Sequence, residues 1–273
     1  MENTTVALIY DFDKTLSTTD MQEYTFIPSL NMTADEFWTI CEKTAHANNM
    51  DTILAALLTM VNQYRKEGMT LSREVLQQHG KNVAFHKGVE RWFQRITEYG
   101  AQLGLNVKHY IISSGLKPMI EGCKIAKNFE RIFACDFVYD ENGNPIWPSV
   151  SINYSSKIQF IYRISKGVLD VYENDKLNMR TSPRTRAVPF RNIVYIGDGL
   201  TDVPSMKLTR LNGGYAVGVY QNAEDGKYLV KDDRVDFYVK ADYSEGSKMD
   251  TVVKAILRKI HAVDEIIKLA DKS

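Results

Sequence analysis

The sequence has few cysteines, no long apolar run and no net charge. Its three cysteines, Cys41, Cys123 and Cys135, form no CxxC pair, which disfavours a disulfide framework and predicts reduced thiols in packing positions. The sequence contains no run of 18 apolar residues and no secretory signal pattern at the N-terminus, so we expect a soluble, cytoplasmic protein without a membrane segment. The 34 basic and 34 acidic side chains balance, which argues against bulk affinity for nucleic acid or acidic membranes.

The segment around which the chain is organised is residues 5–17, TVALIYDFDKTLS. Val6 to Tyr10 form an apolar run that is typical of a buried parallel strand. Because side chains alternate in an extended chain, Asp11 and Asp13 can point to one side while Phe12 packs away from them. Two acids in one small space suit a nucleophile and metal ligand beside a general acid and base. The alternative is a strand that ends in a polar turn with capping aspartates.

Residues 17–83 predict helices. Thr33 can cap one helix, Asp51 can cap the apolar helix that stops at Gly68, and another follows Ser72 through Gln78. At 273 residues the chain is long enough for a core domain and an appended piece. We therefore interpret this block as a helical cap inserted into a sheet domain, with one larger core as the alternative.

A second buried strand, residues 107–115, follows an amphipathic helix that begins after Gly88. The strand ends in Ser-Ser-Gly and is followed by a predicted helix over Met119 to Phe129. A strand, a tight turn and a helix N-terminus form a ready anion site, where Ser113 could donate its hydroxyl to a phosphate oxygen. The alternative is that Ser113 and Ser114 only cap the helix.

Residues 132–140 predict a third strand, and residues 133–153 have the pattern of a hairpin arm. The next helix would be capped by Ser155 or Ser156, which places Lys157 in its first turn. A lysine there opposes the helix dipole unless an anion lies close by. Lys166, on the same helix, is the competing candidate for an anion site.

Asp198 and Asp202 follow another buried strand, in the segment NIVYIGDGLTD. The glycines form a tight turn that releases Asp198 at the carboxyl end of the strand, and Asp202 stands where a helix begins. We predict further strands over residues 215–220 and 235–243, and a final packing helix over residues 249–271. The preceding segment, residues 174–192, is interpreted as a solvated loop, with a phosphate or partner site as the alternative. It contains Lys176, Arg180, Arg184, Arg186 and Arg191.

The ordered set DFDKT, IISSG, a lysine at a helix start, and GDGLTD resembles the four motifs of the haloacid dehalogenase-like (HAD) hydrolase superfamily. The resemblance implies a Mg²⁺-dependent phosphatase that acts on a small phosphorylated metabolite. It implies that Asp11 is the nucleophile that forms an aspartyl-phosphate and that Asp13 is the acid and base. Ser113, Ser114 and Lys157 would bind the phosphoryl oxygens. Mg²⁺ would be held by the carboxylates of Asp11 and Asp198 and the backbone carbonyl of Asp13, with Asp202 supporting that shell.

The fold class that follows is α/β, with a Rossmann-like three-layer core, a mainly parallel sheet and a helical cap of the C1 type. We assign residues 1–18 and 84–273 to the core and 19–83 to the cap. Among C1 members the chain looks most similar to phosphoserine phosphatase-like proteins, but it has SSG for their SGG and Asp20 for their usual glutamate. No cap arginine can be assigned to a substrate carboxylate, with Arg65 and Arg73 as the only guesses. A phosphotransferase with the same intermediate and a non-catalytic Mg²⁺- and phosphate-binding protein remain alternatives.

Overall fold

A computed structural model describes residues 3–182, 185–222, 224 and 226–270. Within this part of the chain, seven strands form one sheet in the order β4-β3-β2-β1-β5-β6-β7. All neighbouring pairs are parallel except β3 and β4. The strands are β1 (Thr4–Tyr10), β2 (Leu105–Leu116), β3 (Arg131–Tyr139), β4 (Pro145–Val150), β5 (Ile193–Gly197), β6 (Tyr215–Tyr220) and β7 (Phe237–Lys240). The predicted α/β class with a mainly parallel sheet is confirmed.

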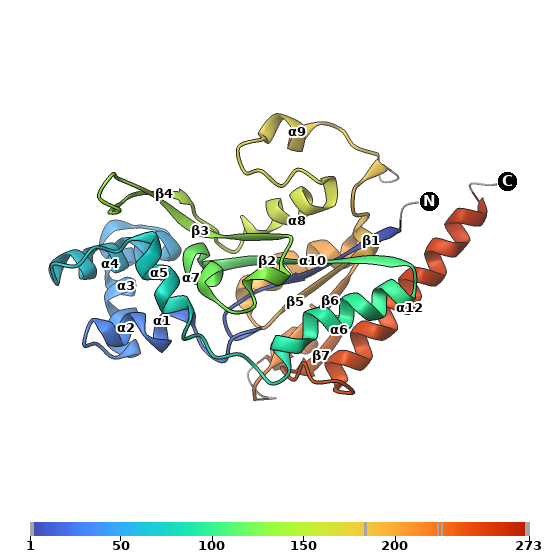
Figure 1. Cartoon of the computed structure of the whole chain (residues 1–273), viewed down its shortest axis with the longest axis horizontal. Coiled ribbons are helices and arrows are strands. Elements are labelled where there is room, and N and C mark those ends of the chain that lie inside the picture. Colours follow the sequence, from blue (N-terminus) through green and yellow to red (C-terminus); the bar gives the residue numbers. More distant parts are fainter. Residues whose placement is uncertain (1–2, 183–184, 223, 225, 271–273) are drawn as a thin grey trace.

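Helices cover both faces of the sheet (Figure 1). One face carries α6 (Val89–Gln102) and the long α12 (Lys248–Ala270), which contact each other. The other carries α8 (Lys157–Lys166) and α10 (Val203–Leu211), which also contact each other. Because both faces are covered, the central strands carry apolar runs, and Val6 to Tyr10 of β1 are fully buried.

The helices between β1 and α6 lie together at one end of the molecule, at the left in Figure 1. They are α1 (Met21–Tyr24), α2 (Phe26–Ser29), α3 (Ala34–Asn48), α4 (Thr52–Lys66) and α5 (Arg73–Gly80). Thr33 caps α3 in a capping box and Asp51 caps α4, as predicted. Ser72 caps α5. The segments that enter and leave this helical block pair through an antiparallel bridge between Ser17 and Phe85. The bridge lies at the predicted cap boundaries, and the division into a cap over 19–83 and a core stays a prediction.

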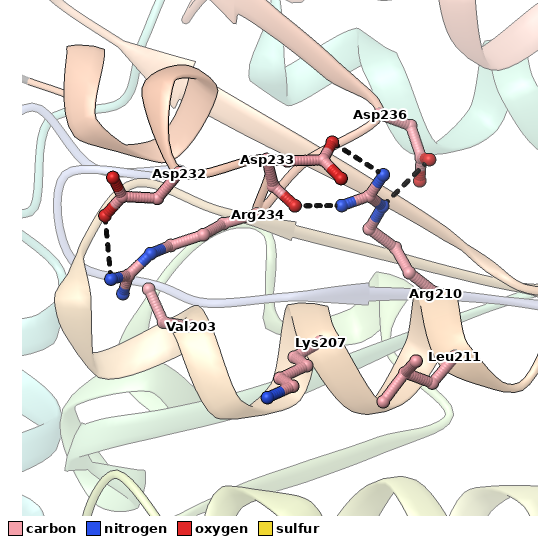
Figure 2. A pocket seen from close by; sticks show the side chains of 8 residues that line it. All are labelled: Val203, Lys207, Arg210, Leu211, Asp232, Asp233, Arg234 and Asp236. Atoms are coloured by element: carbon pink, nitrogen blue, oxygen red, sulfur yellow. Dashed lines mark hydrogen bonds and ion pairs between the residues drawn. The ribbon is translucent and has the colours of Figure 1, made fainter.

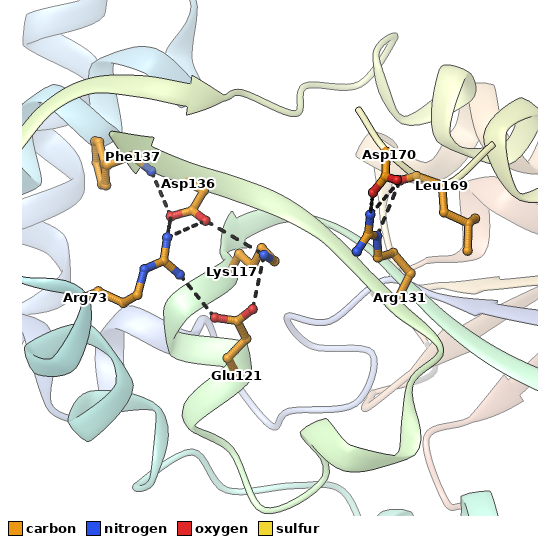
Figure 3. A network of polar contacts seen from close by, with 8 residues as sticks. All are labelled: Arg73, Lys117, Glu121, Arg131, Asp136, Phe137, Leu169 and Asp170. Atoms are coloured by element: carbon orange, nitrogen blue, oxygen red, sulfur yellow. Dashed lines mark hydrogen bonds and ion pairs between the residues drawn. The ribbon is translucent and has the colours of Figure 1, made fainter. Parts of the chain in front are cut away.

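Helix α5 is fixed against the core helix α7 (Lys117–Gly122) by two glycines. A Cβ atom at Gly80 would lie 1.9 Å from the backbone oxygen of Met119, and one at Gly122 would lie 2.1 Å from that of Gln77. The two backbones can approach this closely only because neither glycine has a side chain. An ion-pair network at the same junction adds polar contacts (Figure 3). Arg73 on α5 pairs with Asp136 on β3 at 2.8 Å and with Glu121 on α7 at 3.2 Å.

Several local predictions were wrong. The helix expected over Met119 to Phe129 ends at Gly122, and only a short 3₁₀ turn follows at Ala126–Asn128. Neither Ser155 nor Ser156 caps α8 through its side chain; Ser156 Oγ accepts a hydrogen bond from Asn153 N–H instead. The strand expected over 235–243 is shorter at both ends, because β7 covers only Phe237–Lys240.

The remaining segments agree more closely with expectation. Where residues 174–192 are described, they include α9 (Asn174–Asn178) and a 3₁₀ turn, Phe190–Asn192, and are otherwise mainly irregular. Arg184 lies outside the described residues. A short helix, α11 (Lys227–Lys231), precedes β7. The final helix was expected to reach residue 271, which also lies outside the described part. Cys41, Cys123 and Cys135 are buried free thiols, as predicted. No helix in the described residues is long and apolar enough to cross a membrane.

Candidate active site

Asp11 and Asp13 leave the carboxyl end of β1 and line one cavity of about 250 Å³. Asp11 N–H donates to Ile196 O of β5 at 2.9 Å, which continues the strand pairing up to the acid. Phe12, between the two acids, is fully buried and packs edge-on against Phe85. The predicted alternation of these three side chains is therefore correct.

Lys157 is the buried cation of the site. As the first residue of α8, it lies 3.0 Å from Asp11 Oδ1 and 2.7 Å from Asp202 Oδ1, and it is fully buried. These carboxylates are the anions that offset its unfavourable position at a helix N-terminus. Burial acts to lower the pKa of Lys157, but the charges of Asp11 and Asp202 outweigh it and hold that pKa well above its usual value. Lys166 lies elsewhere and donates to Leu177 O and Met179 O.

Asp198 and Asp202 reach the same place from the turn after β5. Thr15 Oγ1 donates to Asp198 Oδ1 at 3.1 Å, which joins this turn to the loop after β1. Asp202 is fully buried and accepts hydrogen bonds from Tyr195 O–H at 2.7 Å and Gly199 N–H at 3.3 Å, besides that from Lys157. Its carboxylate oxygens are therefore both engaged by the protein, which suits a residue that holds Lys157 in place.

Three carboxylates converge closely enough to share a cation. Oxygen atoms of Asp11, Asp198 and Asp202 lie within 4.8 Å of one another. The donor set is oxygen only, and with Lys157 counted the cluster has a formal charge of −2, which fits a hard divalent cation. The carboxylate of Asp13 is not part of this cluster; its predicted metal contact is through the backbone carbonyl.

The crowding of acids changes their protonation. Burial, followed by the charge of Asp202, raises the pKa of Asp11 to about 7. Burial, followed by the charge of Asp11, raises the pKa of Asp198 to about 8. Burial and the charges of Asp20 and Asp11 hold the pKa of Asp13 well above its usual value. A cation at the cluster would lower the first two values, whereas Asp13 stands outside it and is suited to carry a proton.

Asp13 is held by the start of the helical block. Its Oδ1 accepts a hydrogen bond from Met21 N–H of α1 at 2.7 Å. A Cβ at Gly115 would lie 2.9 Å from Asp13 Oδ2 and 2.1 Å from the end of Met21. Gly115 of the Ser-Ser-Gly segment thus leaves the space that Asp13 and Met21 occupy.

The two serines of the Ser-Ser-Gly segment differ from each other in their contacts. Ser113 is fully buried, and its Oγ accepts a hydrogen bond from Gly115 N–H at 2.9 Å, which leaves its own O–H to donate. Ser114 lines the cavity, and its buried Oγ has no hydrogen-bond partner among the described residues. Both lie in the last residues of β2, which runs on to Leu116, and not in the tight turn that was predicted. Their predicted contact with phosphate stays a prediction.

Lys14 and Asp20 form an ion pair of 2.6 Å at the cavity edge. Lys14 has a left-handed backbone, with φ of 56°, which is unfavourable by roughly 1–2 kcal/mol for a residue with a side chain. This conformation turns the chain after Asp13 so that Thr15 can meet Asp198.

The opposite wall of the cavity comes mainly from the helical block, and sequence reasoning missed most of it. Gln22 lies there with an apolar group: Trp38, Ile53, Ala56, Leu57, Met60 and Leu116. Four of these come from one face of α4, at the helical spacing that the apolar pattern of residues 52–66 does reveal.

The two guessed arginines lie outside this cavity. Arg73 belongs to the network with Asp136 and Glu121 (Figure 3). Arg65 lines a separate apolar groove between α4 and β4.

A larger hollow of about 640 Å³ lies beside α10 and contains none of the predicted site residues (Figure 2). Its acids are paired: Arg210 contacts Asp233 and Asp236, and Arg234 contacts Asp232. It is a surface of mutual ion pairs, unlike the cavity at Asp11, where carboxylates outnumber cations.

Known proteins resemble this chain in fold over nearly its whole length, although no protein-family model matches it. A HAD family hydrolase from Salmonella enterica serovar Typhi aligns with a TM-score of 0.61 and 13% identity, covering 94% of this chain and 72% of that one. A substrate-bound phosphoserine phosphatase aligns with a TM-score of 0.57 and 14% identity, covering 88% and 96%.

One protein is also similar in sequence. An uncharacterized protein from Borreliella burgdorferi is 30% identical, covering 89% of this chain and 93% of its own length. The chain belongs to the same family as this protein and has the HAD hydrolase fold. Within the HAD fold, the acids at Asp11, Asp13 and Asp198 and the cation at Lys157 all lie at the carboxyl edge of the sheet, beneath the helical block.

Proposed function

We propose that this protein is a Mg²⁺-dependent phosphatase that hydrolyses a small phosphomonoester through an aspartyl-phosphate. The observation that carries the proposal is the convergence of Asp11, Asp198 and Asp202 around buried Lys157, with Asp13 beside them in the same cavity. The similarity of fold to phosphoserine phosphatases supports it, and one such structure is of a phospho-aspartyl intermediate analogue.

In the first step an Asp11 oxygen attacks phosphorus, and the bond from phosphorus to the ester oxygen breaks. Asp13, whose raised pKa favours the protonated form, gives its proton to the leaving oxygen, so that a neutral alcohol departs. In the second step Asp13 takes a proton from water as that water attacks phosphorus. The bond to Asp11 breaks, and inorganic phosphate leaves.

The remaining residues hold charge in place. Lys157 offsets negative charge beside Asp11, and the hydroxyls of Ser113 and Ser114 are proposed to donate to phosphoryl oxygens. Mg²⁺, held by Asp11, Asp198 and the Asp13 carbonyl, would neutralise charge on the phosphoryl group. Asp202 would keep Lys157 oriented through its 2.7 Å contact.

The proposal is tested by phosphate release from acetyl phosphate, an aryl phosphate and a panel of phosphorylated metabolites, with Mg²⁺ or with a chelator. We expect release that requires both Mg²⁺ and Asp11, and loss of release in Asp11→Asn with the fold retained. Asp232→Asn, which removes an exposed carboxylate that lines the other hollow and not this cavity, is the control. Undiminished activity of Asp11→Asn would exclude Asp11 as the nucleophile.

The same assay separates the alternatives. Formation of a new phosphate ester when alcohols are added would identify a phosphotransferase. A folded protein that binds Mg²⁺ but releases no phosphate from any of these compounds would favour a binding protein.

A further inference from the structure

The wall of the cavity opposite the acids shows what kind of leaving group it accepts. We propose that the substrate is the phosphomonoester of a small leaving group that has an apolar face and a hydrogen-bond donor but no carboxylate or second phosphate. This inference rests on the proposed phosphatase function. It adds a substrate class and assigns the discriminating residues to the helical block.

The charge of the cavity disfavours a second anion. Among the described residues that line it, the only cationic side chains are Lys14 and Lys157. Lys14 is paired with Asp20 at 2.6 Å, and Lys157 is paired with Asp11 and Asp202. A carboxylate on the leaving group would find no unpaired cation, and it would lie in a space already bounded by four acids. Burying such a charge without a partner is strongly unfavourable.

The two arginines considered from the sequence have other partners or positions. Arg73 contacts both carboxylate oxygens of Asp136, at 2.8 and 2.9 Å (Figure 3), and does not line the cavity. Arg65 lines the groove between α4 and β4 rather than the cavity.

The part of the cavity wall that comes from the helical block is apolar and well packed. Leu57 and Met60 of α4 are buried, and Ala56 is partly buried against the same core. The Nε1–H of Trp38 donates to Glu23 Oε1 at 3.1 Å. Because its polar atom is already used, Trp38 offers ring carbons to a ligand. The volume of about 250 Å³ falls below the roughly 300–1,000 Å³ of pockets that hold drug-sized ligands. The leaving group is therefore small, on the scale of a single ring.

One polar atom in this wall has no partner. Gln22 is 8% exposed and lines the cavity, and its Oε1 is buried without a hydrogen bond to any described residue. Buried amide oxygens are nearly always satisfied. A hydroxyl or N–H group on the leaving group would satisfy this one, which is why the proposed class includes a donor.

The test compares kcat/KM for three matched esters: phenyl phosphate, 4-(hydroxymethyl)phenyl phosphate and 4-carboxyphenyl phosphate. Acetyl phosphate serves as a reference substrate because its leaving group is very small. We expect the hydroxymethyl ester to exceed the carboxyl ester at least tenfold. Equal values, a preference for the carboxyl ester, or hydrolysis of acetyl phosphate with none of the aryl esters would overturn the inference. If even acetyl phosphate shows no release that depends on Asp11, the proposed function itself fails.

Variants test which residues set the preference among the three aryl esters. Ile53→Lys places an amine in the cavity wall, so it should raise the carboxyl-to-hydroxymethyl ratio about tenfold. Leu58→Lys adds the same charge to α4 on the side of the other groove and should leave the ratio as in the wild type. Gln22→Leu should reduce the preference for hydroxymethyl over phenyl ester severalfold. If Ile53→Lys folds and its carboxyl-to-hydroxymethyl ratio equals that of the wild type, the charge argument is refuted. If Ile53→Lys does not fold, the ratio measured for the wild-type protein is the test of that argument.

Discussion

Removal of the buried cation Lys157 should affect stability as well as catalysis. In the wild type its amine contacts Asp11 at 3.0 Å and Asp202 at 2.7 Å, and none of the three side chains has appreciable exposure to water. Lys157→Ala leaves Asp11, Asp198 and Asp202 as an uncompensated acidic cluster. Breaking a buried pair in this way costs about 3–5 kcal/mol. At roughly 2–4 °C per kcal/mol for a chain of this size, Tm should fall by about 6–20 °C.

The decrease in Tm caused by Lys157→Ala should also depend on pH. With pKa values of about 7 for Asp11 and about 8 for Asp198, these acids are largely charged at pH 9 and largely protonated at pH 5. Protonation removes the repulsion that Lys157 offsets, so the difference in Tm between wild type and Lys157→Ala should be largest at pH 9 and shrink toward pH 5.

The assay is thermal unfolding at pH 5, 7 and 9 in the presence of a chelator, so that no divalent cation substitutes for the lysine. Lys166→Ala is the matched control on the same helix, because it loses only contacts to Leu177 O and Met179 O. In the phosphatase assay with Mg²⁺, Lys157→Ala should lose a hundredfold or more, by the order of magnitude known for lost charge-stabilising donors. A Tm equal to that of Lys166→Ala at pH 9, or the reverse ranking in activity, would refute the reasoning.

Two further predictions concern stability. Gly80→Ala places a Cβ 1.9 Å from Met119 O, so α5 and α7 must separate. Unfolding in urea should show a loss of about 1–3 kcal/mol, whereas exposed Gln78→Ala on the same helix should stay within about 0.5 kcal/mol of wild type; equal midpoints would contradict the close approach. Burial lowers the pKa of His109 from 6.5 to about 4, so the unfolded chain binds its proton first as pH falls. The associated stability of about 3 kcal/mol is complete above pH 6.5 and lost toward pH 4, and His109→Gln should lack this part of the pH dependence of the urea midpoint.

The convergence of the acids and Lys157 was predictable because the sequence marks strand ends clearly. Apolar runs precede Asp11, Ser113 and Asp198, and parallel strands place their carboxyl ends at one edge of a sheet. Lys157 was recognisable from its unfavourable position in a helix, since such a residue needs nearby anions. Both inferences depend on local pattern together with one rule of sheet geometry.

The features of the fold and of the candidate site that were not predicted depend on contacts between residues far apart in the sequence. Arg73 contacts Asp136, 63 residues away, so its sequence context could not show that it is committed to an ion pair. Tyr195 was read only as a strand residue, yet its hydroxyl binds Asp202. Gln22 and Trp38 belong to helices whose orientation over the site is set by packing of the whole block. Helix α7 ends at Gly122, whose backbone approaches Gln77 of α5 more closely than a Cβ atom would allow, and this contact is tertiary.

The sheet order has a consequence for how the protein is made. Strand β1 lies between β2 and β5, which begin at residues 105 and 193. During synthesis, the strand that carries Asp11 therefore remains without its second neighbour until residue 196 has left the ribosome. Such long-range pairing is slow to form, and unpaired apolar strand edges promote aggregation in the meantime. The helical block between β1 and β2 is synthesised during this interval, so its own packing can proceed before the edge of the sheet that holds Asp11 and Asp198 is complete.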